Sequence, residues 1–357
     1  MSSMWGDNIK ISLFGESHGQ GIGVVIDGLP PGFELDMAKI AAHTKRRTPG
    51  DFAWSTRREE ADEPEILSGF FNGKTCGTPL AAVIRNTDTR SIDYSDLIAK
   101  PRPGHADITG RIRYKGANDP RGGGHFSGRI TAPLTFAGAI CMQILESRGI
   151  QISAHIREVA GIRDSDAPAP DATPPSKKPF PVYDDERGAQ MQKAIEEAFF
   201  KTDSVGGVVE VFAKGFPAGY GDPFFDSIES RVASMFFSIP AVKGVEFGRG
   251  FEASRHRGSE NNDSPVMDGN VISRKTNNAG GIEGGISNGM PIVVRCAFKP
   301  TSSVAAEQDT VNLETMTNDK LSVRGRHDPC IVPRAVPVVE SALAIVLLDV
   351  LMSPRLD

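Results

Sequence analysis

The 357-residue sequence lacks the patterns that mark several common classes of binding site. Its four cysteines lie far apart and form no C-x-x-C pair, which excludes zinc-finger and thioredoxin-like sites. Lysine and arginine total 40 against 45 aspartate and glutamate, so the net charge of −5 provides no basic excess for a nucleic acid backbone. We therefore expect no nucleic acid partner, and any cationic site must be local.

Long hydrophobic runs are missing too. The longest, residues 341–352, is too short to span a bilayer and contains Asp349, so it predicts a buried helix and no membrane partner. The N-terminal residues lack the basic and then apolar order of a secretory signal. Cys141 and Cys296 lie in apolar runs, as buried free thiols do. These features favour a cytoplasmic protein.

Neither a G-x-x-x-x-G-K-[ST] phosphate loop nor a Rossmann G-x-G-x-x-G motif after a strand is present. No H-x-x-x-H or comparable spacing predicts a metal site. The composition, with 39% hydrophobic and 24% charged residues, is that of an ordinary folded protein.

The chain repeats itself weakly but in order. Three pairs of segments are similar: 23–32 with 208–219, 76–85 with 288–297, and 129–140 with 334–345. Arg129 aligns with Arg334, and both follow an Asp-Pro pair. Duplication is one interpretation, and chance similarity among common turn residues is the other.

On the first interpretation the chain is a single domain over residues 1–357, with pseudo-repeat halves at about 8–160 and 190–352. A proline-rich surface loop, 164–182, would join them. Helical periodicity predicts helices over 33–47 and 131–147, and 70–85 has the form of short paired strands. The predicted fold class is α+β: a sandwich with central helices between mostly antiparallel sheets.

Residues 14–21, "FGESHGQG", place Glu16, Ser17 and His18 among glycines. A flexible turn and an active-site loop are both compatible with this pattern. A serine nucleophile activated by His18 is disfavoured, because adjacent side chains rarely face each other.

Residues 102–129 form a long loop with little hydrophobic pattern, which is unusual in a compact domain unless it is functional. His105 lies near its start. A run of three glycines, 122–124, precedes His125, Ser127 and a predicted helix, and this order favours an anion site at the helix N-terminus. Ser127 could equally be only an N-cap.

Further candidates lie in segments 45–58 with five basic residues, 277–291 with five glycines, and 298–304 with a lysine and three hydroxyls. Segment 324–330 places arginines beside a His-Asp pair that could be structural or a general base. Together they indicate an anionic small-molecule substrate and acid–base chemistry.

Eight blocks in order make the sequence similar to the chorismate synthase family. They are "FGESHG" (14–19), "RRTPG" (46–50), "RPGHAD" (102–107), "DPRGGG" (119–124), "VKGVEFGRGF" (242–251), "NNAGGIEGGIS" (277–287), "KPTSS" (299–303) and "GRHDPCIVPRAVPV" (325–338). They extend from about residue 10 to residue 350, so the resemblance covers nearly the whole chain.

The resemblance implies a lyase that eliminates phosphate and a ring proton from 5-enolpyruvylshikimate-3-phosphate (EPSP) to give chorismate. It implies reduced FMN without net redox change, a β-α-β sandwich with pseudo-symmetry, and a homotetramer. NADPH would serve only indirectly as the source of reduction, through an external flavin reductase.

The resemblance also implies roles for individual residues. His18 would protonate the departing phosphate, His105 would lie near flavin N1, and Asp328 would lie near flavin N5. The residues implied to contact substrate are Ser17, Arg47, Arg129 and Arg334. Those implied to contact FMN are His105, His125, Ser127, Ala241, Gly284, Lys299, Thr301, Ser302, Ser303 and Arg326.

The segment 125–131, "HFSGRIT", departs from the family's usual pattern at His125, Phe126 and Ile130, and keeps Ser127, Arg129 and Thr131. Two other functions remain open at this point: a flavin- or anion-binding protein without catalysis, and a phosphatase or phosphoryl transferase. The second has neither a phosphate loop nor a metal-ligand spacing in its favour.

Overall fold

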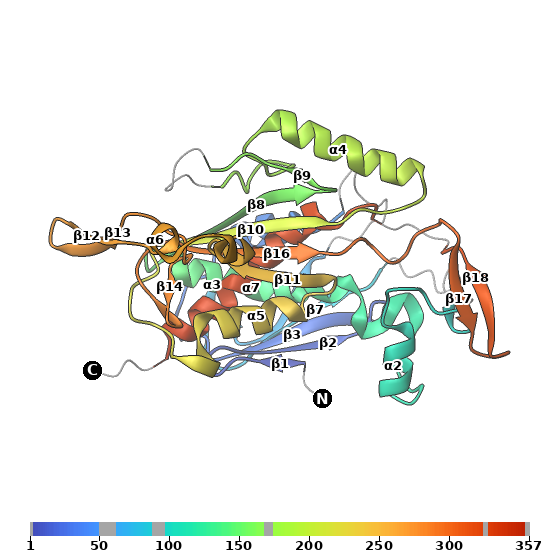
Figure 1. Cartoon of the computed structure of the whole chain (residues 1–357). Coiled ribbons are helices and arrows are strands. Elements are labelled where there is room, and N and C mark those ends of the chain that lie inside the picture. The colour runs from blue at the N-terminus through green and yellow to red at the C-terminus, as the bar shows by residue number, and fades with distance from the viewer. Residues whose placement is uncertain (1–2, 50–61, 88–96, 168–173, 324–327, 354–357) are drawn as a thin grey trace.

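The computed structural model describes residues 3–49, 62–87, 97–167, 174–323 and 328–353. Two five-stranded antiparallel sheets face each other across a layer of helices (Figure 1). The first sheet has the order β1-β2-β3-β7-β4. Its strands are β1 (Met4–Trp5), β2 (Lys10–Gly15), β3 (Gly21–Asp27), β4 (Pro64–Ser68) and β7 (Leu80–Arg85).

The second sheet has the order β11-β16-β10-β8-β9. Its strands are β8 (Gln151–Val159), β9 (Ile162–Arg163), β10 (Gly207–Lys214), β11 (Val242–Phe247) and β16 (Ile292–Phe298). In both sheets apolar residues alternate with partly exposed ones. Val209 and Val211 of β10 are fully buried, as are Ile22 and Val24 of β3, because every second side chain points to the helical layer.

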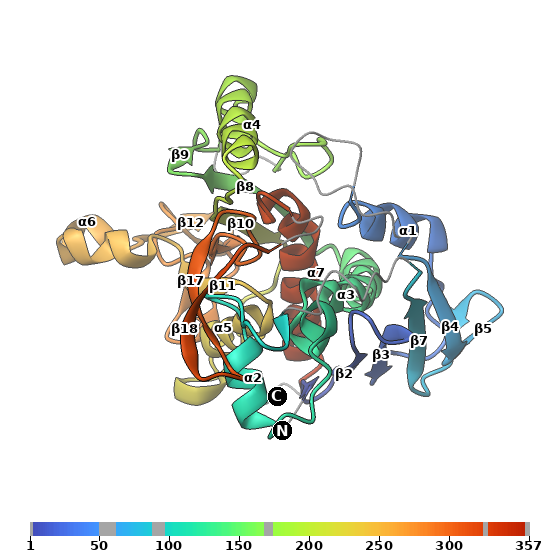
Figure 2. The same ribbon diagram turned by 90° about the vertical axis from the view of Figure 1, so that its right-hand side faces the viewer.

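Two long helices, α3 (Thr131–Glu146) and α7 (Val332–Leu351), form the centre of the sandwich (Figure 2). Nearly every residue of both is buried. They approach closely where Gly138 faces Ser341: a methyl group at Gly138 would lie 2.1 Å from Ser341 Cβ. A helix surrounded by protein on all sides is hydrophobic all round, as these two are.

Three further helices cover this core. α1 (Met37–Lys45) packs on α3, α5 (Ile228–Ser238) packs on α7 and β11, and α4 (Asp185–Phe200) lies on the outer side of the second sheet (Figure 1). α2 (Asp107–Arg113) and the short α6 (Gly258–Asn261) lie at the periphery.

Four small hairpins complete the described fold. They are β5–β6 (Phe70–Phe71 and Lys74–Thr75), β12–β13 (Pro265–Asp268 and Val271–Arg274), β14–β15 (Ile282–Glu283 and Ile286–Ser287) and β17–β18 (Gln308–Asn312 and Thr317–Leu321). β12–β13 and β17–β18 project from opposite ends of the molecule in Figure 1.

The predicted fold class is confirmed: central helices lie between antiparallel sheets. The helices predicted over 33–47 and 131–147 are α1 and α3, and the apolar run 341–352 lies within α7 except for its last residue, Met352, which caps the helix. The proline-rich loop lies on the surface only in part, because its residues Phe180 and Val182 are buried in the hydrophobic core together with residues of the second sheet. The duplication of the two halves stays a prediction.

A buried polar cluster around Asp164 joins both ends of this loop to the second sheet. His155 on β8 lies 3.2 Å from Asp164 Oδ2 through Nδ1 and 3.1 Å from Glu210 Oε1 through Nε2. Burial lowers the pKa of His155, but the hydrogen bonds to the two carboxylates outweigh it and raise the pKa. Asp164 in turn accepts from the backbone N–H of Tyr183 and of Asp184.

By length and composition, one segment of the described residues, Gly128–Glu146, could cross a membrane. It contains α3, and 78% of its most apolar window is buried inside the protein. Burial between two sheets accounts for its apolar composition.

Candidate active site

A cavity of about 990 Å³ opens between the ends of the two sheets and the first turns of α3 and α7. Its volume suits a cofactor together with a small substrate. Most of the residues implied by the resemblance line it: Arg47, His105, His125, Ser127, Arg129, Ala241, Lys299, Thr301, Ser302, Ser303, Asp328 and Arg334.

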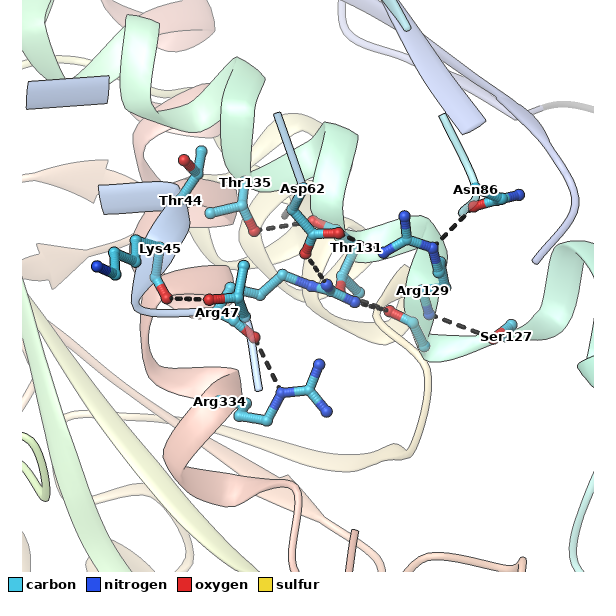
Figure 3. A network of polar contacts seen from close by, with 12 residues as sticks. Thr44, Lys45, Arg47, Asp62, Asn86, Ser127, Arg129, Thr131, Thr135 and Arg334 are labelled. Atoms are coloured by element: carbon cyan, nitrogen blue, oxygen red, sulfur yellow. Dashed lines mark hydrogen bonds and ion pairs between the residues drawn. The ribbon is translucent and has the colours of Figure 1, made fainter. Parts of the chain in front are cut away.

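Three arginines converge on one wall of this cavity. Arg47 follows the last turn of α1, Arg129 lies in a short 3-10 turn before α3, and Arg334 lies in the first turn of α7. Arg334 Nε donates to the carbonyl of Arg47 at 2.9 Å, so the two segments are joined. The sandwich therefore brings together three cations from distant parts of the chain (Figure 3).

Asp62 lies between two of these arginines (Figure 3). Arg47 Nη1 donates to Asp62 Oδ2 at 2.5 Å, and Arg129 Nη1 donates to the other carboxylate oxygen. The Asp62 side chain is 1% exposed. Burial opposes its ionisation, but the charges of Arg47 and Arg129 outweigh burial and lower the pKa of Asp62.

The arginines have further fixed contacts. Arg47 Nε donates to Thr131 Oγ1 at 3.1 Å, and Arg129 Nε donates to Asn86 Oδ1 at 2.8 Å. Burial, followed by repulsion from the other arginines, lowers the pKa of Arg47 to about 10, which leaves it charged at neutral pH. The guanidinium groups of Arg47 and Arg129 are thus held in place by protein groups before any ligand binds.

Arg334 also pairs with Asp328, the carboxylate at the start of the segment that precedes α7. Both side chains are largely buried, and both line the cavity. The predicted FMN contact Arg326 lies outside the described residues.

The Gly-rich segment 122–124 lies directly against His18. Gly122, Gly123 and Gly124 all have positive φ, a conformation that glycine adopts at little cost. A methyl group at Gly122 would lie 2.1 Å from His18 Nδ1. The backbone N–H of Ser17 donates to the Gly124 carbonyl at 3.2 Å, so the two loops are joined.

Ser17 and His18 do face each other, contrary to the expectation for adjacent residues. Ser17 Oγ lies 2.8 Å from His18 Nδ1 and 3.1 Å from the Gly122 carbonyl. When the hydroxyl donates to that carbonyl, it accepts from Nδ1–H, and this contact fixes the orientation of the imidazole. The contact positions the imidazole of His18, and the Ser17 hydroxyl is directed to this ring and to the Gly122 carbonyl.

Both residues are buried, with His18 6% exposed. In the described part of the chain the cavity wall includes Gly122, and neither Ser17 nor His18 is part of it. His18 therefore lies one glycine behind the surface that a ligand would touch.

His105 is held by a charged cluster at the start of α2. Its Nδ1 lies 2.6 Å from Asp107 Oδ1, and Arg102 Nη2 donates to the same oxygen at 2.7 Å. Burial disfavours the Asp107 carboxylate, but hydrogen bonds from Arg102 and His105 lower its pKa. Arg102 also donates to Ser303 Oγ at 3.0 Å, which links His105 to the opposite wall.

That opposite wall is the segment 299–303 together with Ala241. Burial, then repulsion from Lys243 and Arg102, lowers the pKa of Lys299. The hydroxyl of Thr301 is buried and makes no hydrogen bond within the described residues. Ala241 has φ +74, a strained conformation for a residue with a side chain, and such strain is concentrated at ligand sites.

Two predicted contacts have a different environment from the rest. His125 lines the cavity, but its Nδ1 lies 2.9 Å from the Gly15 carbonyl and its Nε2 lies 2.9 Å from Ser3 Oγ. Both ring nitrogens therefore join the N-terminal segment to the loop of His18. Gly284 lies in the β14–β15 turn and is not among the described residues that line the cavity. Its role stays a prediction.

Sequence reasoning missed Asp62, Asn86 and the full role of Arg102. Arg102 and Asp107 lie in the quoted block "RPGHAD", so a signal for them was present. Asp62 and Asn86 have none, because their partners are distant in sequence and only the fold brings them together. Within the described residues, no cluster of histidine, cysteine or acidic side chains could hold a metal ion.

The sandwich and its cavity, with three arginines on one wall, are the fold and site of an α+β enzyme with a small-molecule substrate. The family model for chorismate synthase matches residues 9–352. The chorismate synthase of Pyrococcus abyssi (strain GE5 / Orsay) is 49% identical over 353 residues, which cover 99% of this chain and 98% of that protein. The enzyme of Korarchaeum cryptofilum (strain OPF8) is 46% identical over 98% of this chain and 97% of its own length.

A solved structure described as a crystal structure of chorismate synthase matches with a TM-score of 0.75 and 31% identity, over 98% of this chain and 92% of that one. The chain belongs to the chorismate synthase family. It is an enzyme, a chorismate-forming lyase of the shikimate pathway, and its substrate is a small molecule.

Proposed function

We propose that this enzyme converts EPSP to chorismate with reduced FMN as an obligatory cofactor and no net redox change. The observation that carries the proposal is the convergence of Arg47, Arg129 and Arg334 on a cavity whose other wall is the segment 299–303. EPSP carries one phosphate and two carboxylates, and arginine forks match both groups in a bidentate manner.

The residues of the opposite wall fit FMN. Lys299 supplies a positive charge for the flavin phosphate, and Ser302 and Ser303 supply hydroxyls at the cavity surface. The buried, unpartnered hydroxyl of Thr301 can be satisfied by the same ligand. Reduced FMN would supply transient electron density that assists cleavage of the carbon–oxygen bond and is recovered afterwards.

His18 acts as general acid toward the departing phosphate in this proposal. Ser17 lies 2.8 Å from its Nδ1 and fixes the orientation of the ring. Because His18 lies behind Gly122 and outside the cavity wall, we expect the proton to pass through one water molecule. The three arginines neutralise the charge that develops on the phosphate as it leaves.

His105 and Asp328 line the cavity and serve the other half of the reaction, loss of the ring proton. Asp107 fixes the Nδ1 side of His105, which leaves Nε2 for the flavin. Asp328 is held by Arg334, so it is positioned before the ligands enter. Burial of both ligands strengthens these charged contacts by removing water.

Several finer features also belong to the proposal. We expect a homotetramer in the cytoplasm, with NADPH acting only through an external flavin reductase. The roles of Ser127, Ala241, Gly284 and Arg326 as FMN contacts, and of His125 beside them, remain those of the family resemblance.

An anaerobic assay tests the proposal. The purified protein should form chorismate from EPSP with chemically reduced FMN, and should form none with oxidised FMN alone. A comparison of NADPH plus FMN with chemically reduced FMN reports whether an external reductase is required. Folded, flavin-binding protein without turnover would refute the lyase function and leave a non-catalytic binding protein. Release of phosphate without chorismate would instead indicate a phosphatase.

A further inference from the structure

Asp62 is a buried carboxylate that the sequence did not single out, and it contacts two of the three arginines of the cavity. It binds Arg47 through one oxygen and Arg129 through the other. Asp62 is not among the described residues that line the cavity, whereas both arginines are. We infer that it lies behind the two arginines as seen from the cavity, where it contacts their guanidinium groups.

We propose that Asp62 is a positioning residue that fixes Arg47 and Arg129 in the orientation that binds the anionic groups of the substrate. The proposal rests on the function proposed above. A free arginine side chain loses considerable rotamer freedom when it binds a ligand, and a carboxylate that already holds two of them removes that cost from the binding step.

The backbone supports a dedicated role. Asp62 has φ +51, in the left-handed region that few residues other than glycine, asparagine and aspartate adopt readily. A residue held in this conformation, fully buried and shared by two cations, is held by its surroundings and not by local preference.

A chain of hydrogen bonds extends from Asp62 to the loop that contains His18, residues 16–19. Arg129, held by Asp62, donates from Nε to Asn86 Oδ1 at 2.8 Å. The amide of Asn86 donates to the carbonyls of Glu16 and Gly19, both at 2.9 Å. These two residues flank His18, so the arginine wall and the proposed general acid share one hydrogen-bonded chain. Because Asn86 binds the loop independently of Asp62, substrate binding should depend on Asp62 more than the chemical step does.

Two possible roles for Asp62 predict opposite changes in the KM for EPSP when the carboxylate is removed. If Asp62 only neutralised the arginines, its loss would raise the positive charge of the cavity and lower the KM for EPSP. If it positions them, its loss frees both side chains and raises the KM. Asp62→Asn is the suitable variant, because asparagine retains the shape and tolerates the positive φ.

We expect Asp62→Asn to raise the KM for EPSP by about 10- to 100-fold, while kcat falls by less than about fivefold. Asp164→Asn is the matched control. It also removes a buried carboxylate that contacts a histidine and accepts from three backbone N–H groups, but near β8 and away from the cavity. It should lower the unfolding temperature and leave the KM unchanged.

A double-mutant cycle separates positioning from a general loss of structure. Asp62→Asn should raise the KM less in the Arg129→Lys background than in the wild type, because the contact with residue 129 is already altered there and only the contact with Arg47 is left to lose. It should add its full effect to Lys299→Met, which alters the opposite wall. The proposal would be overturned if Asp62→Asn raised the KM by the same factor in the Arg129→Lys and Lys299→Met backgrounds. An unchanged or lowered KM in Asp62→Asn alone would also overturn it.

If Asp62→Asn does not fold, Thr131→Val tests the same idea at Arg47. It removes the hydroxyl that accepts from Arg47 Nε and keeps the shape of the side chain. We expect a rise of about fivefold in KM for EPSP with the same kcat, and an unchanged KM would refute the positioning role. Wild-type protein that forms no chorismate would overturn the proposed function itself, which distinguishes the two failures.

Discussion

Replacement of Gly122 by alanine tests the position of His18 most directly. The added methyl group would lie 2.1 Å from His18 Nδ1, 2.2 Å from Cε1 and 2.5 Å from Ser17 Oγ. Nonbonded heavy atoms prefer separations of about 3.5–4.0 Å, so the imidazole must move by more than about 1 Å. Both groups of the Ser17–His18 hydrogen bond are displaced by the same methyl.

The magnitude follows from this displacement. A misplacement of about 1 Å in a catalytic group costs about 10²-fold in rate, and complete loss of a general acid costs about 10²–10⁴-fold. We therefore expect kcat for chorismate formation to fall by at least about 10²-fold in Gly122→Ala. Binding of FMN, which depends on the opposite wall, should remain near the wild-type level.

Gly116→Ala is the matched control. Gly116 has φ +77, comparable to the φ +60 of Gly122, but a methyl group there meets nothing within 4 Å. Both variants therefore carry the strain of a left-handed residue, about 1–2 kcal/mol, and only Gly122→Ala displaces the histidine. Thermal unfolding should show a loss of stability in both variants, larger in Gly122→Ala because the buried imidazole must also move, and the anaerobic assay with chemically reduced FMN should show very different rates. A kcat for Gly122→Ala within about threefold of Gly116→Ala would refute the reasoning.

Three further predictions concern the rest of the fold. Gly138→Ala should lower the free energy of unfolding by about 1–3 kcal/mol or more, because its methyl group would overlap the backbone of Ser341 on α7. The pKa of His155 is raised in the folded protein, so its protonation contributes stability that is full below the unfolded pKa of 6.5 and is lost as pH rises through the folded pKa. The free energy of unfolding measured in urea should therefore decrease over that pH range, and His155→Gln should lack this decrease. A thiol reagent should label exposed Cys76 rapidly in the native protein, and should label the buried thiols only after unfolding: Cys141, Cys296 and Cys330.

Each of these has a result that would contradict it. Gly258→Ala, whose methyl group meets nothing within 4 Å, is the control for the helix contact, and equal stabilities of the two variants would show that α3 and α7 adjust freely. A wild-type stability that rises above pH 6.5 would reverse the sign argued for His155. Native labelling of more than one thiol would show that the core opens on the timescale of the reagent, although burial raises the pKa of Cys141 to about 12.

The local elements were largely predictable from the sequence, for physical reasons. The alternation of Ile22, Val24 and Ile26 with small or partly exposed residues marks a strand with one buried face, and β3 has this pattern. The apolar stretches that became α3 and α7 are too uniform for a surface helix, so central positions follow from composition. Block order then indicated the family, because eight short motifs in sequence are far more specific than one.

The site was predictable as a set of residues but not as an arrangement. Motifs placed Arg47, His105 and Lys299 among the candidates, and the fold gathers them around one cavity. No motif indicated that Asp62 contacts two of the arginines. Nor did any motif indicate that the two ring nitrogens of His125 contact Gly15, in the loop of His18, and Ser3, in the N-terminal segment. We expected the adjacent side chains of Ser17 and His18 not to face each other, but in the glycine-rich turn Ser17 Oγ lies 2.8 Å from His18 Nδ1.

The sequence by itself determined which elements form and which chemical groups are available, because hydrophobic periodicity and turn residues act over short distances along the chain. Only the tertiary structure decided which of those groups meet. Arg47 and Arg334 come from opposite ends of the chain and share a wall because α1 and α7 pack on the same core. Asp62, a neighbour of that wall in space, contacts Arg47 and Arg129, and their charges lower its pKa, since electrostatic interaction depends on distance in the fold and not on separation in sequence.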